Sequence, residues 1–225
     1  MGHLAYITRQ GSYSKRDDLV TVGWGNMPDW AKQQPMLLWK ASDMHERNNG
    51  STYRSFTISL PNVLSIDQLI DLAWAEAELL AGLKPFHFAL HMPHSSLQEE
   101  LNPHIHVAIC DRVPDGFSRT PEQMFRRYNP TRPDLGGCRK DSGGLTRLQL
   151  RDQIIAQRKA VADTMNDHLR LHGHSVRVDH RSLREQGKER APEKYLGPKR
   201  IRLMSADEKI AFLAERAGHT EETSN

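Results

Sequence analysis

The sequence predicts an α/β (α+β) protein, with a central antiparallel sheet and helices packed mainly on one of its faces. Three segments that alternate apolar and polar residues predict the strands of this sheet: 52–60, 86–92 and 104–111. Two capped segments with helical character, 66–81 and 146–171, predict the helices that cover it. The chain has 225 residues, which suits one or two domains with a sizeable core.

The strand and helix predictions in the middle of the chain rest on spacing and on capping residues. Phe86, Phe88 and Leu90 alternate with polar or small residues, as in a strand that buries one face. Ser65 is a good N-cap for the helix over 66–81, and Gly82 is a typical stop. We therefore expect a strand, this helix and a strand hairpin to follow one another from residue 52 to residue 111.

The remaining elements are shorter. Towards the N-terminus we expect a short helix over residues 1–13, a loop over 23–35 and a second helix over 35–47. After the strands we expect a short helix from Thr120 to Tyr128 and a mobile basic loop over residues 129–144. The long helix over 146–171 and a short strand over 175–179 should follow. A final helix follows Ser205 and frays over 221–225.

Composition excludes several classes of protein. Hydrophobic residues make up 37% and charged residues 26% of the chain, which is typical of a globular protein and not of a disordered one. No apolar run approaches the ~20 residues of a membrane span, and the N-terminus lacks the apolar region of a signal peptide. Two cysteines, Cys110 and Cys138, are too few for a disulfide scaffold. We therefore expect a cytoplasmic protein.

Charge is distributed unevenly. Residues 139–202 carry 16 Lys and Arg against 8 Asp and Glu, whereas the rest of the chain carries 15 against 20. A basic half in a chain of net charge +3 indicates a polyanionic partner. An arginine-rich solvated helix explains the same pattern equally well.

Three of the 12 histidines fall where two adjacent strands would bring them together. His104 and His106 are two residues apart on one strand and therefore project from the same face. His91 ends the preceding strand. If the two strands pair as a hairpin, the three imidazoles converge, and three imidazoles facing one point form a metal site with positions open for substrate or water.

Other interpretations of these histidines stay open. An isolated His-x-His pair is more often a solvent-facing surface pair than a ligand set. His87 and His94 are nearby alternatives for the third ligand, although we expect His87 outside the first ligand shell and His94 in solvent.

The sequence resembles the MobA/MobL plasmid mobilisation relaxases, which belong to the superfamily of His-hydrophobe-His endonucleases. The resemblance covers roughly residues 3–200 in order. The matching segments are Ala5-Tyr6-Ile7-Thr8-Arg9-Gln10-Gly11-Ser12-Tyr13, Leu60-Pro61, Asn102-Pro103-His104-Ile105-His106-Val107, Asp111-Arg112-Val113-Pro114-Asp115-Gly116, Arg127-Tyr128-Asn129-Pro130, Gly136-Gly137-Cys138-Arg139-Lys140, Val178-Asp179-His180-Arg181-Ser182-Leu183 and Leu196-Gly197-Pro198.

This resemblance implies a relaxase that nicks single-stranded DNA at a transfer origin during conjugative plasmid mobilisation. It implies Tyr6 as the nucleophile, which forms a 5′-phosphotyrosine adduct, and His91, His104 and His106 as metal ligands. The family's ion is Mn²⁺ or Mg²⁺, whereas three imidazoles alone also suit Zn²⁺ or Ni²⁺. The implied partners are transfer-origin DNA, accessory mobilisation proteins and a coupling protein.

The resemblance also suggests roles for further residues. Tyr13 lies two helical turns after Tyr6 and is either a reserve nucleophile or a base-stacking residue. Tyr128 ranks below Tyr6 as a nucleophile. Trp24 and Trp30 either stack on bases or are buried. The predicted DNA-contacting residues are Arg9, Arg126, Arg127, Arg139, Lys140, Arg177 and Arg181.

The chain departs from the family pattern in two places. Relatives have a strand before the tyrosine helix, which we expect to be missing here because only five residues precede Tyr6. Relatives also have acidic residues where Ser55 and Thr57 stand here. We expect a relaxase domain over 1–204 that lacks this strand, followed by a C-terminal helix and tail over 205–225. A non-cutting DNA-binding remnant and a three-histidine phosphoesterase are the alternative functions.

Overall fold

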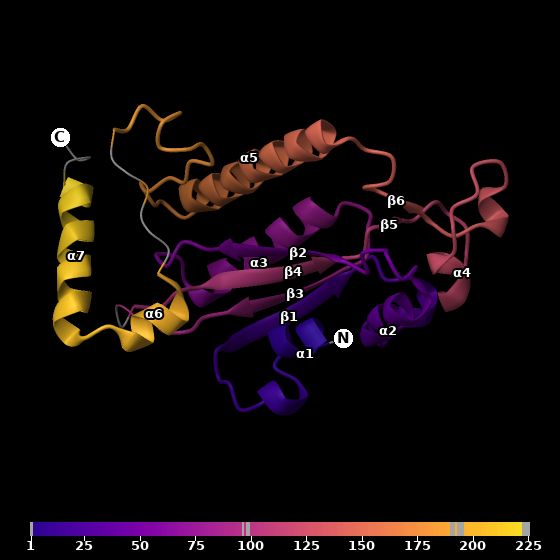
Figure 1. The fold of residues 1–225 in the computed structure, drawn as a ribbon, viewed down its shortest axis with the longest axis horizontal. Helices are drawn as coiled ribbons and strands as arrows, with labels where there is room; N and C mark the ends of the chain where they lie inside the picture. Colours follow the sequence, from indigo (N-terminus) through magenta and orange to yellow (C-terminus); the bar gives the residue numbers. More distant parts are fainter. Residues whose placement is uncertain (1, 96, 98–99, 190–191, 193–195, 222–225) are drawn as a thin grey trace. The chain divides into compact units, whose positions relative to one another are not determined.

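A computed structural model describes residues 2–95, 97, 100–189, 192 and 196–221 of the chain (Figure 1). These residues divide into two compact units. The first contains residues 2–93 and 102–178 and holds the sheet. The second contains the described residues of 94–101 and 179–221. The boundary that we place at residue 204 stays a prediction.

The first unit is built on a four-stranded sheet in which all neighbouring strands are antiparallel. Its strands lie in the order β1 (Leu19–Gly25), β3 (Phe86–His91), β4 (His104–Ile109) and β2 (Arg54–Ser59). The predicted hairpin of β3 and β4 is confirmed, with His91 opposite His104. The antiparallel sheet of a mixed α/β protein is therefore present as expected.

The edge strand β1 differs from our expectation, because its second half lies in the segment that we assigned to a loop. Gly23 and Gly25 made this segment look like a turn. A Cβ atom at either position would collide with the ring of Phe88 or Phe86 on the neighbouring strand. The two glycines are needed because these rings lie across the backbone of β1, which is a packing requirement that the sequence does not reveal.

Helices cover both faces of the sheet, not mainly one as predicted. On one face, α3 (Ile66–Ala81) and α5 (Arg147–Leu171) bury the rings and side chains of Phe86, Phe88 and Leu90. On the other face, α1 (Gly2–Ile7) and α2 (Met36–His45) pack over small residues such as Ala89 and Ala108. Figure 1 shows α5 and α3 on the opposite side of the sheet from α1 and α2.

The two long helices begin as predicted. Ser65 and Gln68 form a reciprocal capping box at the start of α3, and Thr146 and Gln149 form one at the start of α5. At the end of α3, Gly82 adopts a φ of 56°, which explains why a glycine ends this helix.

Several shorter elements correct the predictions. Helix α4 (Pro121–Phe125) ends three residues before Tyr128. The basic segment 129–144 contains a 3-10 turn, Pro133–Leu135, and a strand, β6 (Arg139–Lys140), which pairs with β5 (Arg112–Val113). Residues 175–179 form no strand, since the backbone of Val178 bonds to the side chain of Asn166 instead. Two further 3-10 turns span Gly11–Tyr13 and Asp29–Ala31.

A buried ion cluster fixes the β5–β6 hairpin to the end of α2. The Arg112 guanidinium donates to both carboxylate oxygens of Glu46, and the Lys140 ammonium lies 3.2 Å from the same carboxylate. Arg112 also donates to the carbonyl oxygens of Phe125 and Cys138. This ion pair is almost completely excluded from solvent, because the Glu46 and Arg112 side chains are 2% and 4% exposed.

The second unit contains two helices, α6 (Gly197–Leu203) and α7 (Ala206–Glu221), and a bridge between His94 and Leu101. Helix α7 was predicted and α6 was not. Residues 222–225, where we expected fraying, lie outside the described residues. Across the described part of the chain, no helix is long and apolar enough to cross a membrane.

Glu76 on α3 gives a prediction for the pH dependence of stability. Both of its carboxylate oxygens are buried without a hydrogen-bond partner among the described residues, and burial raises the pKa of Glu76 to about 8. The folded protein therefore holds a proton that the unfolded chain loses above about pH 4.5. We expect the free energy of unfolding to fall as the pH rises from about 4.5 to about 8.

Substitution isolates this effect. Glu76→Gln should flatten the pH profile of the urea unfolding midpoint and raise stability at pH 9 by up to about 5 kcal/mol. Glu78→Gln, at an exposed position of the same helix, should leave the profile unchanged. If the unfolding midpoints of wild type and Glu76→Gln changed with pH in the same way, the raised pKa of Glu76 would be contradicted.

Candidate active site

Three imidazoles converge on the face of the sheet that α1 covers. Their ring centroids lie 5.4 Å (His91 to His104), 5.0 Å (His91 to His106) and 5.1 Å (His104 to His106) apart. Each ring offers one nitrogen, and these nitrogens all lie within 4.8 Å of one another. The predicted trio is therefore brought together by the register of β3 and β4, and it could hold a metal ion.

Hydrogen bonds prepare two of these rings as metal ligands. His104 donates from Nδ1 to the Asn102 carbonyl oxygen at 2.9 Å, which leaves the lone pair on Nε2. His106 Nδ1 lies 3.1 Å from the Thr57 hydroxyl, which stands where we expected an acidic residue in relatives. A hydroxyl that accepts from Nδ1 likewise frees Nε2 of His106, so both rings fit a cation.

The third ring, His91, is fully buried and bonded on both sides. Its Nε2 donates to the Ile7 carbonyl oxygen at 2.6 Å, and its Nδ1 lies 3.2 Å from Nη2 of Arg9. His91 therefore joins a metal site only by giving up one of these bonds. Its place in the trio still fits a cation, because its ring lies against both of the other imidazoles.

Burial keeps the imidazoles of His91 and His106 neutral. Loss of solvent is the largest effect on both His91 and His106, and it lowers the pKa of each to about 4. The neighbouring cationic groups act in the same direction. Neutral rings are the form that binds metal ions, so neither ring needs to lose a proton at neutral pH.

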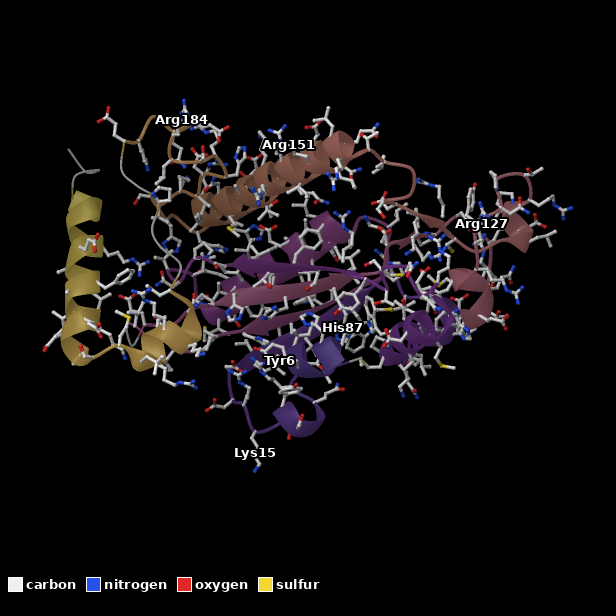
Figure 2. All side chains as sticks on the ribbon, in the orientation of Figure 1. Tyr6, Lys15, His87, Arg127, Arg151 and Arg184 are labelled. Carbon is white, nitrogen blue, oxygen red and sulfur yellow. The ribbon has the colours of Figure 1, made fainter. Side chains whose placement is uncertain are left out.

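Tyr6 lies beside the trio on α1. Its ring centroid is 6.4 Å from that of His106, and Arg9 and Arg16 stack on the ring at 4.7 and 5.7 Å. Nη1 of Arg16 is 3.4 Å from the Tyr6 hydroxyl. Tyr13 packs edge-on against Tyr6 with centroids 5.2 Å apart. Figure 2 shows Tyr6 on α1, alongside the sheet that carries the histidines.

Some residues of this site were not predicted. His3 stacks on the ring of Tyr53, and its Nε2 lies 3.2 Å from the Ser55 hydroxyl. His3 also lies edge-on to His106, at 6.4 Å between centroids. The sequence signal for His3 is its position one helical turn before Tyr6. Asp18, which binds Arg9, carried no comparable signal.

The other residues that we considered as a third ligand, a nucleophile or a base-stacking residue do not join the three histidines. His87 is on β3, but both of its ring nitrogens are buried without a hydrogen-bond partner among the described residues, and its ring packs against Trp24. His94 belongs to the second unit. No ring contact within the described part of the chain links Tyr128 to the trio. The Trp30 indole nitrogen is buried, which agrees with a packing role.

The predicted DNA-contacting residues fall into two groups. Arg9 and Lys140 are engaged inside the protein: Arg9 is 7% exposed and bound to Asp18, and Lys140 pairs with Glu46. The others are exposed: Arg126, Arg127, Arg139, Arg177 and Arg181. Figure 2 shows Arg127 beside α4, well separated from Tyr6. Their contacts with DNA stay a prediction.

Comparison with known proteins decides the family. The model of the MobA/MobL family matches residues 5–205, which is most of the chain. The chain belongs to the MobA/MobL family. It is 37% identical over 191 residues to a 43 kDa relaxation protein from Salmonella typhimurium, and 36% identical over 196 residues to mobilization protein A from Escherichia coli. Mobilization protein MobL from Acidithiobacillus ferridurans is 30% identical over 173 residues.

This chain aligns with only part of each relative. The alignments cover 84%, 86% and 68% of this chain but 52%, 26% and 43% of the three relatives. A solved structure reported as "Molecular Basis of Vancomycin Resistance Transfer in Staphylococcus aureus" shares the fold, with a TM-score of 0.51 and 24% identity. The match covers 76% of this chain and 79% of that one. This likeness shows the mixed α/β fold alone.

Thr57 provides a test of the metal site. Thr57→Val removes the hydroxyl beside Nδ1 of His106, and loss of such a partner typically weakens metal binding by about 10–100-fold. We expect a loss within this range in the Zn²⁺ affinity measured by isothermal titration calorimetry. Thr57→Ser keeps the hydroxyl and should bind like wild type. Equal affinities for the valine and serine variants would contradict the assigned role.

Proposed function

We propose that this chain is a relaxase that nicks one strand of single-stranded transfer-origin DNA during plasmid mobilisation. The observation that carries the proposal is the placement of the Tyr6 ring beside His106, within a site where three imidazoles converge. A nucleophile next to a cation site is an arrangement that favours phosphoryl transfer. Membership of the MobA/MobL family supports the same reaction.

In the proposed step, the Tyr6 phenol oxygen attacks the scissile phosphorus. A bond forms between Oη and phosphorus while the bond from phosphorus to the 3′ oxygen breaks. The phenol proton is lost to solvent, and the leaving 3′ oxygen takes up a proton from solvent. The products are a 5′-phosphotyrosine and a free 3′ hydroxyl, and the phosphodiester bond energy is kept for rejoining.

The residues around Tyr6 support this attack. Arg9 and Arg16 lie against its ring, and a nearby positive charge favours the developing phenolate. Arg16 also reaches the hydroxyl itself. The edge-on contact with Tyr13 further restricts the Tyr6 ring. These contacts hold the nucleophile in place, which is a main source of catalysis in phosphoryl transfer.

A cation held by His91, His104 and His106 would polarise a non-bridging phosphate oxygen and neutralise its charge. We propose Mn²⁺ or Mg²⁺ as the physiological ion, because the phosphate adds a hard oxygen ligand to the three nitrogens. Zn²⁺ and Ni²⁺ also suit the imidazoles.

Exposed cations would bind the DNA backbone. Arg127 and Arg139 are exposed on the α4 and β6 segments, and Arg177 follows α5. Contacts between these side chains and phosphates would make the affinity fall steeply with salt. We also propose that accessory mobilisation proteins and a coupling protein act with this chain.

Tyr6→Phe tests the reaction. Incubation with a single-stranded transfer-origin oligonucleotide and Mn²⁺ should give a covalent protein–DNA adduct in wild type. The adduct should be absent in Tyr6→Phe, because the attacking oxygen is gone, and present in Tyr13→Phe. A denaturing gel measures the adduct. Salt-sensitive binding without any adduct would favour the non-cutting DNA-binding alternative, and neither binding nor adduct would favour the small-phosphoester hydrolase.

A further inference from the structure

The side chain of Arg9 touches both Tyr6 and His91. Its Nη1 donates to the Tyr6 carbonyl oxygen at 2.7 Å, and the guanidinium carbon lies 4.7 Å from the centre of the Tyr6 ring. Its Nη2 lies 3.2 Å from Nδ1 of His91. The Arg9 side chain is 4% exposed, so these contacts form in a site from which water is almost excluded.

The backbone at Arg9 is adapted to this position. Arg9 has a φ of 54°, and only one other non-glycine residue in the described ranges, Asn26, has a positive φ. A residue with a long side chain keeps a left-handed backbone only where the surrounding contacts hold it there, and such residues cluster at functional sites. Here the left-handed turn directs the guanidinium back beneath α1, towards β3.

Asp18 anchors the guanidinium to the sheet. It accepts from Nε and Nη2 of Arg9 at 2.7 and 2.8 Å, which is a bidentate pair. The Asp18 carbonyl oxygen accepts from the Met92 backbone amide at 2.8 Å, directly after His91 on the chain. Asp18, which holds Arg9, therefore lies beside the same end of β3 as His91, which Arg9 also contacts.

The hydrogen bonds of His91 fix where its proton lies. A guanidinium can only donate and a carbonyl oxygen can only accept. Nδ1 therefore accepts from Arg9, and Nε2–H donates to the Ile7 carbonyl. A neutral imidazole has one lone pair in its ring plane, and in His91 this lone pair faces Arg9.

A cation must break this bond whichever nitrogen it uses. Binding through Nδ1 displaces Arg9 directly. Binding through Nε2 displaces the Ile7 carbonyl and moves the proton to Nδ1, where it would face the N–H of Arg9, donor against donor. Both routes remove the hydrogen bond between Arg9 and His91.

We propose that Arg9 is a positioning residue that ties His91 to the Tyr6 segment and competes with a divalent cation for the His91 lone pair. A bound cation then weakens the attachment of His91 to α1, and this attachment weakens cation binding. This inference rests on the proposed function only in treating Tyr6 as the nucleophile; the competition for His91 is independent of any reaction with DNA.

Arg9→Gly tests the competition, because glycine adopts the left-handed backbone without strain and removes the guanidinium. We expect this variant to bind Zn²⁺ about tenfold more tightly than wild type by isothermal titration calorimetry, since a charge-assisted competitor of His91 is gone. Its rate of adduct formation with transfer-origin DNA should fall about tenfold or more, because Tyr6 is no longer held. A variant that was merely destabilised would lose both properties.

Arg16→Gly is the matched control. It removes the same charge from the neighbourhood of Tyr6, but Arg16 is exposed and makes no contact with His91 among the described residues. Its Zn²⁺ affinity should stay within about twofold of wild type. Equal gains in Zn²⁺ affinity for Arg9→Gly and Arg16→Gly, or no gain for Arg9→Gly, would overturn the proposal.

A measurement on the unmodified protein covers the case in which Arg9→Gly fails to fold. The ¹⁵N shifts of the His91 ring should show the proton on Nε2 without a cation, and a changed proton pattern on addition of Zn²⁺. A proton on Nδ1 in the ion-free protein would overturn the proposal. Neither the Zn²⁺ titration nor the ¹⁵N measurement uses DNA. A failure of the nicking reaction would therefore leave both results intact and would be recognised separately.

Discussion

The antiparallel pairing of β3 with β4, in the register that sets His91 opposite His104, determines the rest of the site. Since side chains alternate across a strand, a shift of one residue would turn one histidine strand to the opposite face and separate the trio. The same register brings Ala89 and Ala108 to this face, where they share a core cluster with Leu4 and Ile7 of α1. Small residues allow the tyrosine helix to pack closely, and this packing places Tyr6 beside His106.

Cationic side chains in this protein serve two different purposes. Arg9, Arg112 and Arg119 are each 7% exposed or less and are held by carboxylates and backbone carbonyls inside the first unit. Removing one partner from such a pair leaves a buried charge and is strongly destabilising. Arg127, Arg139 and Arg177 are exposed and remain available to a polyanion. An excess of positive charge in the sequence does not separate these two groups.

Most of the sheet and the trio could be predicted from the sequence, because both depend on local patterns. Strict alternation gave β2, β3 and β4, capping residues marked α3 and α5, and the His-x-His spacing fixed two ligands on one face. The errors came from contacts between distant residues. Strand β1 contains glycines that make room for the Phe86 and Phe88 rings, and residues 175–179 bond to Asn166 instead of forming a strand. The links of Arg9 to Asp18 and His91 span up to 82 positions in the sequence, and no local pattern reveals them. The choice of Tyr6 depended on the family resemblance, since a tyrosine on a short helix is usually a packing residue.

We propose that a divalent cation binds among His91, His104 and His106, next to Tyr6. Anomalous diffraction from crystals soaked in Zn²⁺ tests it most directly. We expect an anomalous peak about 2.0–2.1 Å from one nitrogen of each ring, on the side that Tyr6 faces. A peak at other residues, or one that excludes His91 or lies away from Tyr6, would contradict it.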